Sequence, residues 1–253
     1  MTERSDFAVA SNSSTSEVEA REAFFERFVS SPIPPSERLS NLGLYLSRQT
    51  LSRVLLMNEL YQLQLPVHGV IMEFGVRWGQ NLALFSSLRG IYEPFNYGRR
   101  IIGFDTFSGF PSVSPEDGQH STIAEGAYGV TDGYEAELEA VLRYHESESP
   151  LAHIRKFELQ KGDATQTLER YLVAHPETII SMAYFDFDLY EPTRRCLELI
   201  RPHLTRGTVL AFDELCWPTF PGETIAVREV LGLDRYAIRR SPLSPNASWL
   251  VVD

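Results

Sequence analysis

The sequence predicts an α/β fold built on a mostly parallel sheet, with a helical cap before it and an antiparallel hairpin at its C-terminal end. Apolar runs that are too short for helices alternate five times with helical patterns. Several of these runs end in an acid or a glycine, which is typical of strand ends that face a ligand. Two last strand-like segments, 236–240 and 248–252, are joined by a turn rich in Ser, Pro and Asn, which indicates the hairpin.

The 253 residues are enough for one large domain with appendages. Residues 1–16 are polar and rich in Ser and Thr, so we expect a disordered tail there. Helical patterns begin at Glu17 and resume after a Pro-rich break at 31–35, which predicts an N-terminal helical cap over 17–65 and a main domain over 66–253. The cap is more apolar than surface helices need to be. We therefore expect it to pack on the main domain, on a neighbouring subunit of a homo-oligomer, or on both.

Composition excludes several classes of partner. A net charge of −11 argues against a nucleic-acid surface, because phosphate contacts need clustered Lys and Arg. No apolar run approaches the ~20 residues of a membrane span, and the first residues do not resemble a signal peptide. Cys196 and Cys216 fit a reducing compartment and show no metal-ligand spacing. We expect a cytoplasmic protein that binds neither nucleic acid nor membrane.

The stretch from His68 to Asn81 reads as a strand, a tight loop and the start of a helix. Its apolar run, 70–72, is too short for a helix. Gly75 and Gly79 indicate positions where the backbone takes a positive φ or lies close to another group. The N-terminus of the following helix points back at the loop, where it suits the carboxylate or hydroxyls of a small molecule.

The spacing within this stretch discriminates between cofactors. Dinucleotide folds use G-x-G-x-x-G, whereas this chain has Glu73-x-Gly75-x-x-x-Gly79, with an acid on the strand. An anion there repels a pyrophosphate and attracts an amine or a sulfonium. The pattern therefore favours S-adenosylmethionine over NAD, and the alternative is a generic strand-to-helix turn.

Two further acids follow predicted strands. The second strand, 99–105, ends at Asp105, a position from which an acid accepts hydrogen bonds from ribose hydroxyls in nucleoside-binding α/β folds. Asp163 lies just beyond the third strand, 154–159, where it can take an adenine amino group. The alternative for Asp105 is a solvated carboxylate or a turn former.

Residues 111–133 hold many Gly, Ser and Pro and no apolar period. Loops of this length inside a compact domain are usually lids or binding loops. The histidine in the loop, His120, is either an exposed loop residue or a base.

Paired acids end the fourth and fifth predicted strands. Asp186 and Asp188 lie on the same side of an extended backbone, and Asp213 and Glu214 end the next strand. Adjacent parallel strands would bring Asp186, Asp213 and Glu214 together as an all-oxygen cluster that suits Mg²⁺ or Ca²⁺. The alternative is a set of capping or solvated acids.

Four blocks of this sequence resemble class I S-adenosylmethionine methyltransferases, and specifically the macrocin O-methyltransferase family of metal-dependent sugar-methylating enzymes. The blocks are residues 73–79, 103–111, 186–193 and 207–214, in the order that the family keeps. The resemblance implies a Rossmann-like class I methyltransferase fold with a seven-stranded sheet. Within the family the chain looks most like enzymes that methylate a deoxysugar nucleotide in antibiotic pathways.

The resemblance also implies roles for individual residues. The methionine end of the cofactor would be lined by Glu73, Gly75, Gly79 and Asn81, the ribose by Asp105 and the adenine by Asp163. Magnesium would be held by Asp186, Asp213 and Glu214, although the family usually has Asp-Asp where this chain has Asp213-Glu214. His120 is the candidate for a histidine that the family uses, but the residues beside it match poorly.

These observations predict a methyl transfer from S-adenosylmethionine to a hydroxyl of a sugar or sugar nucleotide. A divalent ion would chelate two neighbouring sugar oxygens and lower the pKa of one of them. Asp186 or His120 would take the proton, and the loop 111–133 would close over the site. Two rival hypotheses are an NAD-dependent α/β oxidoreductase and a cofactor-binding homologue without catalysis.

Overall fold

The computed structural model describes residues 13–253. Seven strands within this range form one sheet: β1 (Val70–Phe74), β2 (Ile101–Asp105), β3 (Phe157–Lys161), β4 (Ile180–Phe185), β5 (Leu204–Phe212), β6 (Arg239–Arg240) and β7 (Ser248–Val251). They lie in the order β3-β2-β1-β4-β5-β7-β6. The first five strands pair in parallel, whereas β7 runs antiparallel to both β5 and β6. The predicted mostly parallel seven-stranded sheet with a C-terminal antiparallel hairpin is confirmed.

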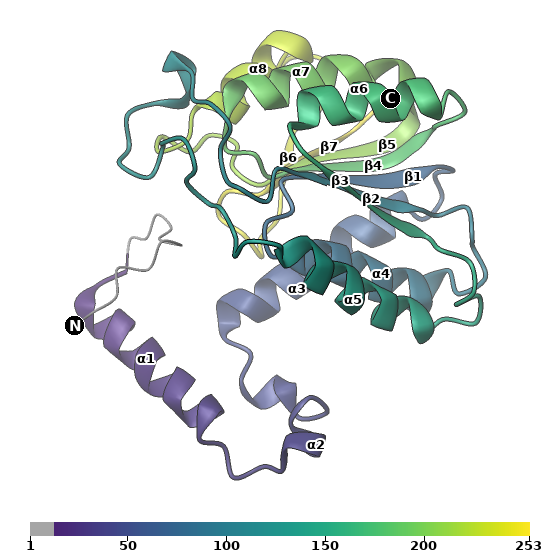
Figure 1. Ribbon diagram of the computed structural model, residues 1–253. Coiled ribbons are helices and arrows are strands. Elements are labelled where there is room, and N and C mark those ends of the chain that lie inside the picture. Colours follow the sequence, from purple (N-terminus) through teal and green to yellow (C-terminus); the bar gives the residue numbers. More distant parts are fainter. Residues whose placement is uncertain (1–12) are drawn as a thin grey trace.

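Helices cover both faces of this sheet (Figure 1). One layer holds α3 (Arg48–Gln64), α4 (Gln80–Tyr92) and α5 (Tyr134–Ser147), and the other holds α6 (Ala164–Ala174), α7 (Tyr190–Ile200) and α8 (Gly222–Val230). The shorter or outlying helices are α1 (Thr15–Val29), α2 (Pro35–Arg38), η1 (Leu42–Leu44), η2 (Pro115–Asp117) and η3 (Arg201–His203). Because parallel strands need crossover connections, helices bury the central strands on both sides.

The two sides of β1 belong to two separate cores. Val70, Met72 and Phe74 pack with side chains of α6, α7 and α8, whereas Ile71 packs with side chains of α3, α4 and α5. This alternation is the two-residue period of a strand. The same period places Glu73 on the side of Ile71, and only 1% of Glu73 is exposed. A carboxyl group is therefore buried at the end of a central strand.

The N-terminal cap consists of two parts. The apolar pattern from Leu42 to Leu63 predicts a single helix, but the chain forms the turn η1 and then starts α3 at Arg48. Ser47 caps α3 by accepting a hydrogen bond from the backbone N–H of Thr50 at 3.1 Å. Helix α3 packs on the main domain, whereas α1 projects away from it (Figure 1), and none of the fifteen described residues of α1 is buried.

The predicted disordered tail, 1–16, falls outside the described residues up to residue 12, and α1 begins at Thr15. Along residues 13–253, no helix has both the length and the apolar character that crossing a membrane requires.

Candidate active site

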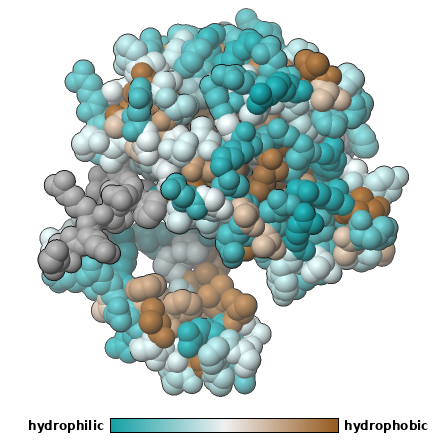
Figure 2. Space-filling view, in the orientation of Figure 1, coloured by the Kyte–Doolittle hydropathy of each residue, from teal (hydrophilic) through white to brown (hydrophobic). Residues whose placement is uncertain are grey.

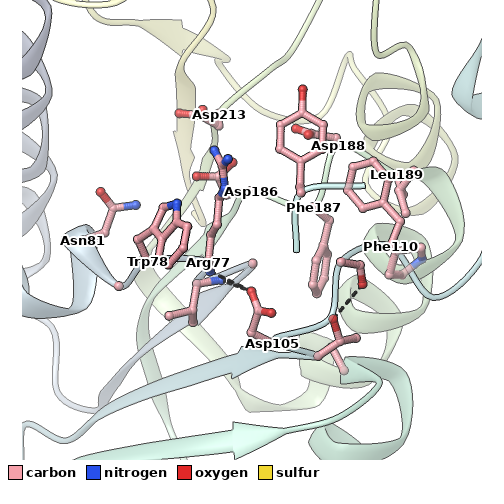
Figure 3. A pocket seen from close by; sticks show the side chains of 18 of the residues that line it. Arg77, Trp78, Asn81, Asp105, Phe110, Asp186, Phe187, Asp188, Leu189 and Asp213 are labelled. Atoms are coloured by element: carbon pink, nitrogen blue, oxygen red, sulfur yellow. Dashed lines mark hydrogen bonds between the residues drawn. The ribbon is translucent and has the colours of Figure 1, made fainter. Parts of the chain in front are cut away.

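A cavity of about 430 Å³ opens at the carboxyl ends of the parallel strands (Figure 3). All five loops at these strand ends contribute to its lining, with Trp78 after β1, Phe110 after β2, Asp163 after β3, Asp186 after β4 and Asp213 after β5. The strand order reverses beside β1, since β2 and β4 lie on its two sides. Such switch points are where open α/β sheets bind their ligands.

The glycines of the first loop are needed for its shape. Gly75 has φ +87°, and a Cβ there would lie 2.0 Å from the carbonyl oxygen of Asp186. Gly79 has φ +77°, and a Cβ there would lie 2.3 Å from the side chain of Leu138. The prediction of positive φ or close approach is confirmed at both positions. The loop is thereby pressed against the end of β4 and against α5.

Asp105, at the end of β2, fixes the same loop through hydrogen bonds to its backbone. One of its carboxylate oxygens accepts hydrogen bonds from the backbone N–H groups of Val76 and Arg77, at 2.7 and 2.8 Å (Figure 3). The other oxygen accepts one from the N–H of Phe107 at 2.6 Å. Asp105 also lines the cavity. It therefore fixes the backbone of two cavity loops, a task that sequence analysis did not assign to it.

Glu73 and Asn81 form a buried pair beneath the cavity. The side-chain amide of Asn81 donates to one Glu73 oxygen at 2.9 Å. The other oxygen of Glu73 is buried and has no hydrogen-bond partner among the described residues. Burial raises the pKa of Glu73 well above its usual value. A buried acceptor without a partner fits a cationic or amine-bearing group bound beside it.

Arg53, a residue of α3 that sequence analysis missed, connects this pair to the strand-end acids. Its guanidinium donates to Asn81 at 3.2 Å, to Asp186 at 2.9 Å and to Asp213. The hydroxyl of Tyr184 also donates to Asp213, at 2.5 Å. About a quarter of the Arg53 and Asp186 side chains is exposed, so this ion pair is partly shielded from water. No pattern in the sequence of α3 distinguishes Arg53 from a surface arginine.

Asp188 does not share a face with Asp186. Strand β4 ends at Phe185, and Asp188 takes φ +63°, so the extended backbone predicted as far as Asp188 is wrong. Asp188 instead hydrogen-bonds with Glu214. Burial raises the pKa of Asp188 to about 6, and burial beside the Asp188 carboxylate raises the pKa of Glu214 to about 12. The raised pKa of Glu214 favours its protonated form, which can donate a hydrogen bond to Asp188.

The predicted magnesium ligands do not fit a divalent ion as they lie. Among residues 13–253, no three acidic, His or Cys side chains are grouped so that they could hold a metal. Asp186 and Asp213 already share the positive charge of Arg53, and Glu214 is hydrogen-bonded to Asp188. A guanidinium thus lies where sequence analysis expected the ion.

The remaining two predicted residues lie in different surroundings. Asp163 lines the cavity and caps α6, accepting a hydrogen bond from the N–H of Thr165 at 2.9 Å. His120 is exposed, and its Nδ1 lies 2.8 Å from the hydroxyl of Thr122. His120 does not belong to the described residues that line the cavity, whereas Phe110, just before its loop, and Tyr128, within the loop, form part of the wall. Of the predicted site residues, the described lining of the cavity lacks only His120 and Glu73, and Glu73 is hydrogen-bonded to Asn81, which lines it.

Two of the solved structures that resemble this chain match it over nearly its full length at more than 40% identity. The chain is 45% identical to the calicheamicin methyltransferase CalS11, with a TM-score of 0.93 over 99% of this chain and 98% of that one. It is 43% identical to apo CalS11, described as a TDP-rhamnose 3′-O-methyltransferase in calicheamicin biosynthesis, with a TM-score of 0.84 over 95% and 96% of the two chains. The O-methyltransferase NovP is 16% identical with a TM-score of 0.56 over 79% of each chain, which supports the fold alone. No protein-family model and no curated protein matches the chain.

Proposed function

The chain belongs to the family of the calicheamicin methyltransferase CalS11, a family of class I S-adenosylmethionine-dependent O-methyltransferases, and on that premise we propose that it methylates a hydroxyl of a nucleotide-linked deoxysugar in natural-product biosynthesis. The observation that carries the proposal is the full-length similarity to CalS11. Because CalS11 is described as acting on TDP-rhamnose, a TDP-linked deoxyhexose is the acceptor of choice.

The cavity supports a place for each part of the cofactor. The methionine end would lie over Gly75 and Gly79, near the Glu73 oxygen that lacks a partner, and Asn81 would hold Glu73 in place. The ribose and adenine would lie toward Asp105 and Asp163, which line the cavity farther along the sheet edge. When bound, S-adenosylmethionine supplies an electrophilic methyl group on a sulfonium.

Asp186 is the best-placed base for the acceptor hydroxyl. It lines the cavity, and burial together with the nearby Asp213 carboxylate raises its pKa well above the usual value, although Arg53 opposes this shift. A carboxylate with a raised pKa takes a proton more readily. Arg53 would offset one of the two negative charges of Asp186 and Asp213 while the acceptor binds.

The loop that carries His120 would cover the bound substrates. Its base is closed by two backbone hydrogen bonds, from the N–H of Phe110 to Ala127 and from the N–H of Gly126 to Phe110, each 2.9 Å. His120 would reach the cavity only if this loop moved. The direct test compares Asp186→Asn with His120→Ala: we expect the first to lower kcat at least ~100-fold and the second to lower it less.

The proposal itself is tested in two steps. Isothermal titration with S-adenosylhomocysteine should show binding, and a methyl-transfer assay on TDP-rhamnose and related nucleotide sugars should show turnover. Binding without transfer to any nucleotide sugar would contradict the proposed acceptor. No binding would contradict the assignment of the cavity to the cofactor.

A further inference from the structure

A second cavity, of about 590 Å³, adjoins the first. It lies between the N-terminal half of α3, which contributes Arg48 and Ser52, and the end of β6 with the chain that follows it, which contribute Arg240 and Leu243. Arg53 lines both cavities. The two spaces therefore meet at the side chain that bridges Asp186 and Asp213.

The charge of this second cavity is opposite to that of the whole chain. Its described lining includes Arg48, Arg53 and Arg240 and no acidic residue, although the net charge of the chain is −11. Arg53 is neutralised by its two aspartates. Arg48 and Arg240 are exposed, and neither forms an ion pair with any carboxylate among residues 13–253. Arg48 is also the first residue of α3, so the positive end of the helix dipole adds to the potential.

The rest of the lining is apolar or small. Leu56, Leu243 and two prolines, Pro242 and Pro245, form the walls. Prolines and leucines present flat apolar surface to a nucleobase or a deoxyribose, while two unpaired guanidiniums present forked donors to phosphate oxygens. The volume falls within the range of about 300–1,000 Å³ that small-molecule sites occupy.

We propose that this second cavity binds the nucleoside diphosphate of the acceptor, with Arg48 and Arg240 holding the diphosphate. This inference rests on the proposed function, and it assigns the acceptor to an orientation. The sugar extends from the diphosphate past Arg53 into the first cavity, where its hydroxyl meets Asp186. Arg53 does not bind the diphosphate, because its ion pairs with Asp186 and Asp213 hold its side chain between the two cavities.

The test is equilibrium binding of thymidine diphosphate to the full chain saturated with S-adenosylhomocysteine. We expect Arg48→Ala and Arg240→Ala each to weaken this binding about tenfold or more, since charge-assisted hydrogen bonds are lost. The affinity for S-adenosylhomocysteine should not change, which also verifies that the variants fold. Arg239→Ala is the matched control: Arg239 is the exposed neighbour of Arg240 in β6 and does not line the cavity.

Further ligands identify what the site recognises. Inorganic pyrophosphate and thymidine should each bind more weakly than thymidine diphosphate; pyrophosphate binding of equal strength would reduce the site to a simple anion site and overturn the proposal. Equal binding of thymidine diphosphate by the wild type and both variants would also overturn it, even if nucleotide sugars are methylated. If the nucleotide binds at Arg48 and Arg240 but no nucleotide sugar is methylated, the proposed function fails while the nucleotide site stands.

Discussion

Burial of Glu73 favours ligand binding but lowers the stability of the ligand-free protein. Its buried oxygen without a partner suits a ligand, but burying a carboxyl group costs free energy when it ionises. The native pKa is raised above the usual 4.5. At pH values between these two pKa values, the native state therefore holds a proton that the unfolded state has lost. The stabilising contribution of this proton is complete below about pH 4.5. It is lost, by up to about 1.4 kcal/mol for each pH unit, as the pH rises toward the native pKa.

We therefore expect Glu73→Gln to raise the melting temperature of the ligand-free protein, and by more at pH 8 than at pH 5. The same variant should bind S-adenosylmethionine more weakly, because a cationic ligand favours the ionised carboxylate and the amide cannot ionise. Calorimetry at the two pH values and titration with the cofactor measure these effects. A variant that is less stable than the wild type at pH 8 would show that the buried carboxyl group is needed for folding.

Arg53 raises a different question, namely whether a guanidinium replaces a metal ion. Arg53→Met would leave Asp186 and Asp213 to repel each other without a cation between them. We expect a loss of about 1–3 kcal/mol of unfolding free energy, below the cost of breaking a fully buried pair because a quarter of the side chain is exposed. Arg143→Ala, which breaks an exposed ion pair with Glu139, should cost less than about 1 kcal/mol.

The effect of Mg²⁺ on the melting temperature tests whether the Arg53 guanidinium takes the place of a metal ion. Mg²⁺ should raise the melting temperature of Arg53→Met, because two freed carboxylates then bind it, and should leave the wild type unchanged. If Mg²⁺ stabilises the wild type as strongly as the variant, the arginine does not replace the ion and the magnesium site of the sequence analysis is supported.

At the scale of elements, Asp117 joins the loop after β2 to helix α7. Its side chain is buried, and one oxygen accepts a hydrogen bond from the N–H of Tyr190, the first residue of α7. The other oxygen accepts one from the N–H of Ser114 at 2.7 Å. A carboxylate at a helix N-terminus satisfies an unpaired donor and complements the helix dipole. One side chain thus fixes both the loop and the helix that follows Asp186 and Asp188.

Asp117→Ala should lower the unfolding free energy by about 1–2 kcal/mol, the usual cost of a lost cap, and should loosen the loop 111–133. Limited proteolysis measures the loosening, since cleavage should move into this loop. Gln119→Ala is the control, because Gln119 lies in the same loop and is exposed. Equal cleavage of both variants would contradict the anchoring role of Asp117.

The start of β3 differs from the start that the sequence predicts. The third strand was expected over 154–159, but β3 begins at Phe157. The residues before β3 form a turn instead. The ammonium of Lys156 stabilises this turn by donating to the carbonyl oxygens of Leu151 and Ile154, at 2.6 and 2.5 Å. The sequence shows a lysine there but not that it is buried.

At the scale of the whole molecule, the N-terminal segment around α1 leaves apolar side chains exposed. Apolar side chains gather on it (Figure 2), and Phe24, Phe25 and Val29 of α1 are 40%, 60% and 52% exposed. Phe24 and Phe28 contact Tyr45, but α1 has no buried residue. An apolar surface of this kind usually covers, or is covered by, another chain. We propose that the protein is a homo-oligomer in which this segment packs on a neighbouring subunit.

Light scattering coupled to size exclusion measures this state directly. We expect the wild type to be an oligomer and Phe25→Ser with Val29→Ser to dissociate it, because each substitution removes apolar area that association would bury. Val173→Ser is the control, since Val173 is 77% exposed on α6, away from this segment. A monomeric wild type would contradict the proposal.

The sequence by itself determined the order of strands and helices, the two glycines of the first loop and the acids at the strand ends. These are local properties, because apolar periodicity and the φ that glycine allows are set by neighbours in the chain. Only the tertiary structure decided what those acids meet. Arg53 is 133 residues from Asp186 and 160 residues from Asp213, and it reaches them because α3 packs across the sheet. No local pattern encodes such a contact, so the sequence could not show that a guanidinium lies between the acids that it predicted as metal ligands.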